Sequence, residues 1–271
     1  MSTINVGGKL LSLSDCRVMA IVNVTDESFY AASRQRSEED IERRMSEAVE
    51  EGADILDIGG CSTRPMSEPV DLETEWCRVS KALKIARCKF ADMPLSLDTF
   101  RAEVARRAIS EYGDMIINDV SGLREGEMAE VAGSAGVPYV LTHWAVPDES
   151  RDILEQLIDF FAKKADLLQF AGVKDIIIDP GFGFSKNTSQ NWEIMRRLRE
   201  LEILGKPVLA GVSRKTMIRE LLGCTSEEAL NGTTAANMQA LWGGAKILRV
   251  HDVREAKEAV KVYEKCAGGV G

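Results

Sequence analysis

The sequence predicts an α/β fold: a single (β/α)8 TIM barrel preceded by an N-terminal β-hairpin. Eight short apolar runs rich in Val, Ile and Leu recur along the chain, and amphipathic helical patterns separate them. Buried parallel strands that alternate with helices have this appearance. No Gly-, Pro- or Ser-rich linker or charge block divides the runs, so we expect residues 1–271 to form one domain. A doubly wound open sheet is the structural alternative.

The expected strands follow one another at the spacing of β/α units. They cover residues 18–23, 54–58, 94–98, 114–118, 138–143, 175–179, 207–211 and 246–250. In front of the first strand, the segment INVGGKLLSL alternates around a Gly-Gly pair, which is typical of a hairpin. We expect this hairpin to close the bottom of the barrel.

Helix signals lie between the strands. Ser37 stands in front of three acidic residues, as an N-cap does, and an apolar face begins at Ile41 and ends before Gly52. A second apolar stripe covers residues 154–168, and a final helix covers residues 253–266. We interpret these stripes as parts of the core.

Composition limits the possible partners. The 271 residues are 45% hydrophobic and 28% charged, as in ordinary globular proteins, and the formal net charge is −9. This balance argues against a nucleic-acid partner, because binding to phosphate backbones requires basic faces. An anionic ligand is still allowed, because screening over about 8 Å lets a few local Lys and Arg residues outweigh distant acids.

The sequence also predicts a cytoplasmic protein with no membrane partner. The first twenty residues lack the charged start and apolar run of a signal peptide, and no stretch approaches the roughly 18 apolar residues of a membrane span. Six cysteines without any CxxC pair suggest reduced thiols rather than a zinc cluster or a redox couple.

Polar residues terminate nearly all of the apolar runs. In chain order, the ends carry Asn23, Asp57 with Gly59 and Gly60, Asp98, Asn118 with Asp119, His143, Asp179, Ser213 to Lys215, and Arg249 with His251. Each of these residues alone has an ordinary structural explanation, such as a helix cap, a turn or, for His143, a hydrogen-bonded buried imidazole. In a β/α barrel, however, all of these positions meet at the face that carries active sites. Together they predict one polar ring.

The basic members of this ring suit an anion. Arg249 and His251 lie two apart on an extended run, so both side chains can face the same group. Lys215 lies in the segment SRKTMIRELLG, which resembles a loop entering a short helix where backbone N–H groups also favour an anion. This arrangement suits a diphosphate. The alternative is that Arg214 and Lys215 are an ordinary pair of surface cations.

The acidic and amide members suit a different part of a ligand. Asp98, Asn118 and Asp179 lie in an otherwise apolar mouth, where a carboxylate without a donor is strongly unfavourable. The N–H-rich edge of a guanidine-like heterocycle supplies such donors.

Seven segments, in this order, resemble the dihydropteroate synthase family along nearly the whole chain. They are VMAIVNVTDESF, ADILDIGGCSTRP, PLSLDTFRAEVA, IINDVSG, IIIDPGFGFSK, PVLAGVSRK and ILRVHDV. The resemblance implies a β/α barrel that joins 6-hydroxymethyl-7,8-dihydropterin diphosphate to para-aminobenzoate, releases diphosphate, requires Mg²⁺ and is inhibited by sulfonamides. It also implies a homodimer, for which a helix face near the C-terminus is available.

The resemblance assigns roles to individual residues. Asn23 would hold the magnesium ion, and Lys215, Arg249, His251 and Arg64 would be catalytic. The substrate-binding residues would be Phe29, Thr63, Arg64, Asp98, Asn118, Asp179, Phe184, Lys215, Thr216, Arg249 and His251. Among these, the acids, the amide and Lys215 would grip the pterin, Arg249 and His251 would bind the diphosphate, and Thr216 would face the aminobenzoate carboxylate.

Several positions depart from the family pattern. They are Asp26 and Glu27 in place of a Pro-Asp pair, Cys61 in place of Glu, Met66 in place of Gly, and Thr142 and Trp144 in the segment LTHWA in place of LMHM. The first four would alter loop closure, and the last two would reshape the pterin pocket or the aminobenzoate entrance.

Two other functions are therefore considered. A methyltetrahydrofolate–corrinoid methyltransferase is also a pterin-binding barrel, but it does not need the cations of SRK and RVHD. A catalytically weak paralogue that only binds pterin or a partner would explain the altered loops.

Overall fold

The computed structural model describes residues 3–24, 34–61 and 70–268, and its central feature is a closed barrel of eight parallel strands. The strands follow chain order around the barrel, and the last pairs with the first. Their bounds are β3 Arg17–Asn23, β4 Ile55–Gly59, β5 Leu95–Asp98, β6 Ile116–Asp119, β7 Tyr139–Thr142, β8 Ile176–Asp179, β9 Val208–Ala210 and β10 Ala245–Val250. The predicted TIM barrel is confirmed, and the open-sheet alternative is wrong because the barrel is closed.

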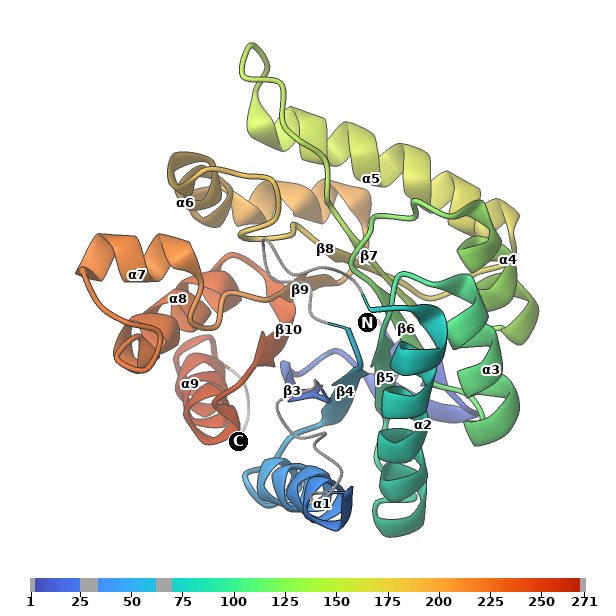
Figure 1. Ribbon diagram of the computed structural model, residues 1–271. Helices are drawn as coiled ribbons and strands as arrows, with labels where there is room; N and C mark the ends of the chain where they lie inside the picture. Colours follow the sequence, from blue (N-terminus) through green and yellow to red (C-terminus); the bar gives the residue numbers. More distant parts are fainter. Residues whose placement is uncertain (1–2, 25–33, 62–69, 269–271) are drawn as a thin grey trace.

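Helices surround the strands (Figure 1). They are α1 Arg34–Glu50, α2 Leu72–Lys89, α3 Ala102–Tyr112, α4 Gly126–Ala135, α5 Ile153–Phe170, α6 Thr188–Arg196, the 3₁₀ helix η2 Leu198–Leu204, α7 Thr216–Leu222, α8 Leu230–Trp242 and α9 Val253–Cys266. The expected stripe of α5 is buried, as the spacing predicted. The prediction that Ser37 caps α1 is wrong, because the helix begins at Arg34. The segment before Ser37, Arg-Gln-Arg, consists of good helix formers that extend the first turn.

The predicted hairpin is confirmed at the bottom of the barrel. Strands β1 Thr3–Val6 and β2 Lys9–Ser12 pair antiparallel, with Val6 opposite Lys9. The two residues of the turn, Gly7 and Gly8, both have positive φ, at 60° and 81°, which explains the Gly-Gly pair.

An apolar layer fills the barrel above the hairpin. It consists of Met19, Ile55, Ile116, Val140, Ile177, Leu209 and Ile247, and it packs on Ile4, Val6 and Leu13 below. Alternate residues of a strand face the same side, so residues two positions further along also face the barrel axis, one step nearer the carboxyl ends. Five of them are polar and form what we call the polar layer: Asp57, Asn118, Thr142, Asp179 and Arg249. The fold thereby stacks a polar layer on an apolar one.

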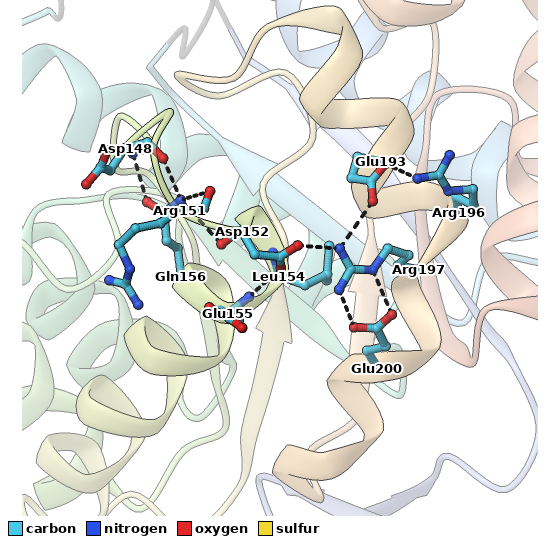
Figure 2. A network of polar contacts seen from close by, with 10 residues as sticks. All are labelled: Asp148, Arg151, Asp152, Leu154, Glu155, Gln156, Glu193, Arg196, Arg197 and Glu200. Carbon is cyan, nitrogen blue, oxygen red and sulfur yellow. Dashed lines mark hydrogen bonds and ion pairs between the residues drawn. The ribbon is translucent and has the colours of Figure 1, made fainter.

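An ion-pair network holds the start of α5 against the end of α6 (Figure 2). Asp152 caps α5 by accepting hydrogen bonds from the backbone N–H groups of Leu154 and Glu155. The Arg197 guanidinium donates to the same carboxylate at 2.6 Å and to Glu200 through two nitrogens at 2.7 and 2.8 Å. One guanidinium thus joins two neighbouring helices on the outside of the barrel.

Within the parts of the chain that the structure describes, no helix has both the length and the apolar composition that crossing a membrane requires. Among residues 3–24, 34–61 and 70–268, no two cysteines form a disulfide.

His143 follows β7 and is buried against α5. Its ring lies edge-on to Phe160, with 4.8 Å between the ring centroids. Among the described residues, its Nδ1 atom has no hydrogen-bond partner. The expectation of a hydrogen-bonded imidazole is therefore wrong for this nitrogen. Burial and, to a smaller extent, the nearby Lys186 ammonium lower the pKa of His143 to about 3.

The folded protein should lose stability as the pH falls below 6.5. The imidazole binds a proton near pH 6.5 in the unfolded chain, whereas the folded His143 stays neutral down to about pH 3. Its contribution to the free energy of unfolding is therefore complete above pH 6.5 and decreases as the pH falls below that value. At pH 5 the loss amounts to about 2 kcal/mol relative to pH 7.5. Urea unfolding of wild type and His143→Gln at both pH values measures it. An equal pH effect in the two proteins would contradict the prediction.

Candidate active site

Strand register brings the predicted polar residues together at the barrel mouth, the end of the barrel where the strands terminate. Asn23 of β3 lies opposite Gly59 of β4, and Gly59 lies opposite Asp98 of β5. Asp98 in turn lies opposite Asn118 of β6, and Asp179 ends β8 two strands further along. Residues up to about 150 positions apart in the chain therefore share one site.

A buried ion-pair cluster occupies the centre of the mouth. Arg249 donates from Nε to Asp57 Oδ2 at 2.6 Å and from Nη2 to Asp98 Oδ2 at 2.5 Å. Asn118 Nδ2 donates to the same Asp57 oxygen at 3.0 Å. Both carboxylates are buried. The guanidinium that we expected to face an anion is thus held between two acids, and its contact with a diphosphate stays a prediction.

Burial changes the protonation of the acids in the mouth. It raises the pKa of Asp98 to about 7, although the Arg249 guanidinium opposes this shift. It also raises the pKa of Asp179, opposed by a hydrogen bond from the Gly181 N–H at 2.8 Å. Burial therefore disfavours the charged form of both acids.

The polar layer also contains buried atoms that no described residue satisfies. They are Asp57 Oδ1, Asn118 Oδ1, Thr142 Oγ1 and, within strand β5, Ser96 Oγ. Each buried polar atom without a partner costs on the order of 1–3 kcal/mol. Three of the four atoms are carboxylate or hydroxyl oxygens and one is an amide oxygen, and all of them accept N–H donors.

Two glycines shape the loop after β8. At Gly181, with φ of 69°, an added Cβ would lie 2.2 Å from the His143 carbonyl oxygen, so no other residue fits. At Gly183, with φ of 79°, a Cβ would lie 3.1 Å from the Lys215 side chain. The two glycines allow a tight bend, which brings the loop close to two other loops of the mouth.

Lys186 fastens this loop to the barrel. Its buried ammonium donates to three backbone carbonyls: His143 at 3.0 Å, Gly181 at 3.1 Å and Phe184 at 3.1 Å. Burial lowers its pKa to about 7, opposed by the Asp179 carboxylate. The ammonium therefore fixes the backbone of Phe184 relative to the end of β7.

The predicted Arg-Lys pair divides after β9. Arg214 has a φ of 56° and turns away from the mouth, where Nε and Nη2 donate to the two Asp252 oxygens at 2.9 and 2.7 Å. Lys215 enters the mouth, and its ammonium lies 4.4 Å from the centroid of the Phe184 ring. Burial lowers the pKa of Lys215 to about 8, opposed by Asp179. One member of the pair is structural, and the other belongs to the site.

His251 lies just past the end of β10, next to Arg249. Its Nδ1 atom is 3.1 Å from the Ser213 hydroxyl oxygen. Burial lowers the pKa of His251 to about 4, and the guanidinium of Arg249 adds to this. The imidazole is therefore neutral at pH 7, and it can offer a neutral donor to an anion near Arg249.

Thr216 begins α7 with its side chain exposed. Its hydroxyl accepts a hydrogen bond from Arg219 Nη2 at 2.8 Å. A hydroxyl and a guanidinium thus lie side by side on this turn, which suits a carboxylate.

Asn23, the expected magnesium ligand, ends β3 with an exposed side chain. Among residues 3–24, 34–61 and 70–268, no group of three or more His, Cys, Asp or Glu side chains is placed to hold a metal ion. A single amide oxygen is a poor site for zinc, but it suits Mg²⁺, which keeps several waters and takes its other ligands from substrate phosphates. The residues therefore fit a magnesium ion that arrives with a diphosphate.

Several predicted residues lie outside the described residues. They are Phe29, Thr63 and Arg64 of the expected site and Asp26, Glu27 and Met66 of the altered loops. The departures Cys61, Thr142 and Trp144 are described, and Cys61 and Thr142 are buried.

Two residues of the mouth were missing from the predicted site. Asp57 belongs to the predicted polar ring but not to the predicted site residues. Its central position follows because it lies two residues after Ile55, so both side chains face the barrel axis, and the sequence does show this spacing. Lys186 was missed altogether, because its three partners are backbone carbonyls that no side-chain pattern reveals.

Comparison with known proteins gives a consistent result. Residues 19–251 match the family described as pterin binding enzyme. The chain is 37% identical to the dihydropteroate synthase of Clostridium beijerinckii, over 96% of this chain and 97% of the other. It superposes on the Xanthomonas albilineans dihydropteroate synthase with 4-aminobenzoic acid at a TM-score of 0.92, with 38% identity and 99% of both chains covered.

A second solved structure adds the other ligand. The dihydropteroate synthase of Thermus thermophilus in complex with 6HMPPP superposes at a TM-score of 0.85, with 36% identity, over 97% of this chain and 99% of the other. The order of motifs, the closed barrel, the polar mouth and these similarities agree. The chain belongs to the pterin-binding enzymes, as a member of the dihydropteroate synthase family.

Proposed function

We propose that this protein condenses 6-hydroxymethyl-7,8-dihydropterin diphosphate with 4-aminobenzoate to give 7,8-dihydropteroate and diphosphate. The observation that carries the proposal is the Arg249 guanidinium between Asp57 and Asp98. Carboxylates so placed accept a planar row of N–H donors, and the pyrimidine edge of a pterin carries a guanidine-like row of the same kind. The relatives with 4-aminobenzoic acid and 6HMPPP support the two substrates.

The reaction breaks the C–O bond between the pterin methylene and the diphosphate and forms a C–N bond to the arylamine. The leaving diphosphate takes the bonding electrons, and the arylamine nitrogen then gives up a proton to water. Arg249 and His251, together with Arg64, meet the negative charge that develops on the leaving group, and Lys215 grips the pterin. The carboxylates of Asp98 and Asp179 balance positive charge in the pterin ring. No protein nucleophile takes part.

Magnesium completes the set of cations in this proposal. Asn23 would be the ligand from the protein, and oxygens of the diphosphate would supply further ligands. Bound there, Mg²⁺ would supply positive charge beside the leaving group.

We also propose that the protein acts in the cytoplasm as a homodimer. The family resemblance supports this state, and α9 carries the exposed apolar Val262 on the helix face near the C-terminus that is available for a partner copy. A molar mass in solution of one chain would contradict the homodimer.

The function is tested with the purified protein, both substrates and Mg²⁺. We expect dihydropteroate and diphosphate in equal amounts. Binding of the pterin diphosphate without turnover, measured by calorimetry, would favour the catalytically weak paralogue. The methyltransferase alternative is not favoured, because the relatives named above are synthases.

Lys215→Ala should lower kcat/KM by about 100- to 1000-fold. The ammonium is near Asp179 and is a preorganised donor to the pterin in this proposal, and removal of one such donor costs about 3 kcal/mol of transition-state stabilisation. Steady-state kinetics measure the effect, with an Arg197→Ala variant on the outside of the barrel as the control. An unchanged rate would refute this role for Lys215.

Asn23→Ala should raise the Mg²⁺ concentration required for half-maximal activity. The variant loses one oxygen ligand, whereas the phosphate ligands remain, so the maximal rate at saturating Mg²⁺ should fall less than the apparent metal affinity. Titration of a chelator-treated enzyme with MgCl₂ measures both quantities. The same half-maximal concentration in wild type and variant would place the metal elsewhere.

A further inference from the structure

Trp144 lies against Phe184 at the barrel mouth. The two rings are stacked, with 4.7 Å between their centroids and 29° between their planes. Trp144 follows β7 and Phe184 lies in the loop after β8, so the contact joins two separate loops. Both side chains are half-buried. Neither is one of the residues of the hydrophobic core. The contact therefore concerns the mouth rather than the core.

The Phe184 ring also contacts Lys215. The ammonium nitrogen lies 4.4 Å from the ring centroid, within the range of a cation–π interaction. Trp144 also has a cation beside it: the Arg124 guanidinium lies 5.9 Å from the centroid of the indole ring. A single phenyl ring thus connects an indole to the ammonium that the proposed mechanism uses.

The remaining freedom of Phe184 lies in its side chain. Its carbonyl is held by the Lys186 ammonium at 3.1 Å, and the preceding Gly183 packs closely on the Lys215 stem. With the backbone fixed in this way, the ring can still rotate about its side-chain torsions. A flat indole stacked on the ring selects one orientation, because offset aromatic stacking is directional.

We propose that Trp144 is a positioning residue for Lys215, acting through Phe184. The indole holds the phenyl ring in the orientation that places the Lys215 ammonium toward the pterin. The inference rests on the proposed synthase function, since Lys215 is the group through which Trp144 acts. It also gives a role to a residue that departs from the family pattern, in which methionine is frequent at this position.

The test compares two substitutions at position 144 and repeats one of them in a second background. Trp144→Leu should lower kcat for dihydropteroate formation by about 2- to 12-fold, the range that an aromatic pair contributes. Trp144→Phe restores a stacking ring and should stay within about twofold of wild type. In a Lys215→Ala background, Trp144→Leu should cause no further loss, because the group it positions is gone.

The lack of a further loss separates positioning from general destabilisation, which would lower the activity of both backgrounds alike. Trp76→Leu is the matched control, because it removes an aromatic contact with Tyr112, at 6.4 Å, on the outer helices α2 and α3. This control should leave kcat unchanged.

The outcomes are distinct. An active wild type whose kcat is unaffected by Trp144→Leu, an equal loss for Leu and Phe, or an equal loss in both backgrounds would overturn the role of Trp144 and leave the synthase function standing. A wild type that forms no dihydropteroate would overturn the function and, with it, this inference.

Discussion

The polar mouth depends on the apolar layer beneath it. Because side chains alternate along a strand, the requirement that residues such as Ile55 and Ile247 fill the barrel interior dictates that Asp57 and Arg249 also face inward, one step nearer the mouth. A shift of one residue in β4, β8 or β10 would move an acid or a cation out among the helices and an apolar residue into the site. The same packing that makes the barrel stable therefore positions its charges.

Burial then sets the electrical character of the mouth. Isolated charges in such a place are costly, and each is compensated by a partner: Arg249 by two carboxylates, Lys186 by three carbonyls and Asp179 by a backbone N–H. The pKa of Asp98 is raised and that of Lys215 is lowered by the same cause. An acid and an amine whose pKa values lie near neutrality, Asp98 and Lys215, therefore face a ligand that carries N–H donors on one side and phosphates on the other.

The sequence predicted the strands and most of the ring, because each strand of a parallel barrel is a short apolar run with a polar end. It could not assign Arg214 and Lys215 to different sides, since this depends on one residue with positive φ. Nor could it reveal the stack of Trp144 on Phe184, because two loops must first be brought together by the barrel. Contacts with the backbone, such as those of Lys186, leave no trace in a pattern of side chains.

Gly181 has a consequence for how this mouth changes during evolution. Since even a methyl group there would overlap the His143 carbonyl, the turn is closed to every other amino acid, and the wall it forms must be inherited unaltered. Substitutions that alter ligand preference are then restricted to other positions of the mouth, where a different side chain can fit. Position 144, half-open to solvent and already occupied by an unusual side chain, is where lineages of this enzyme have scope to drift apart.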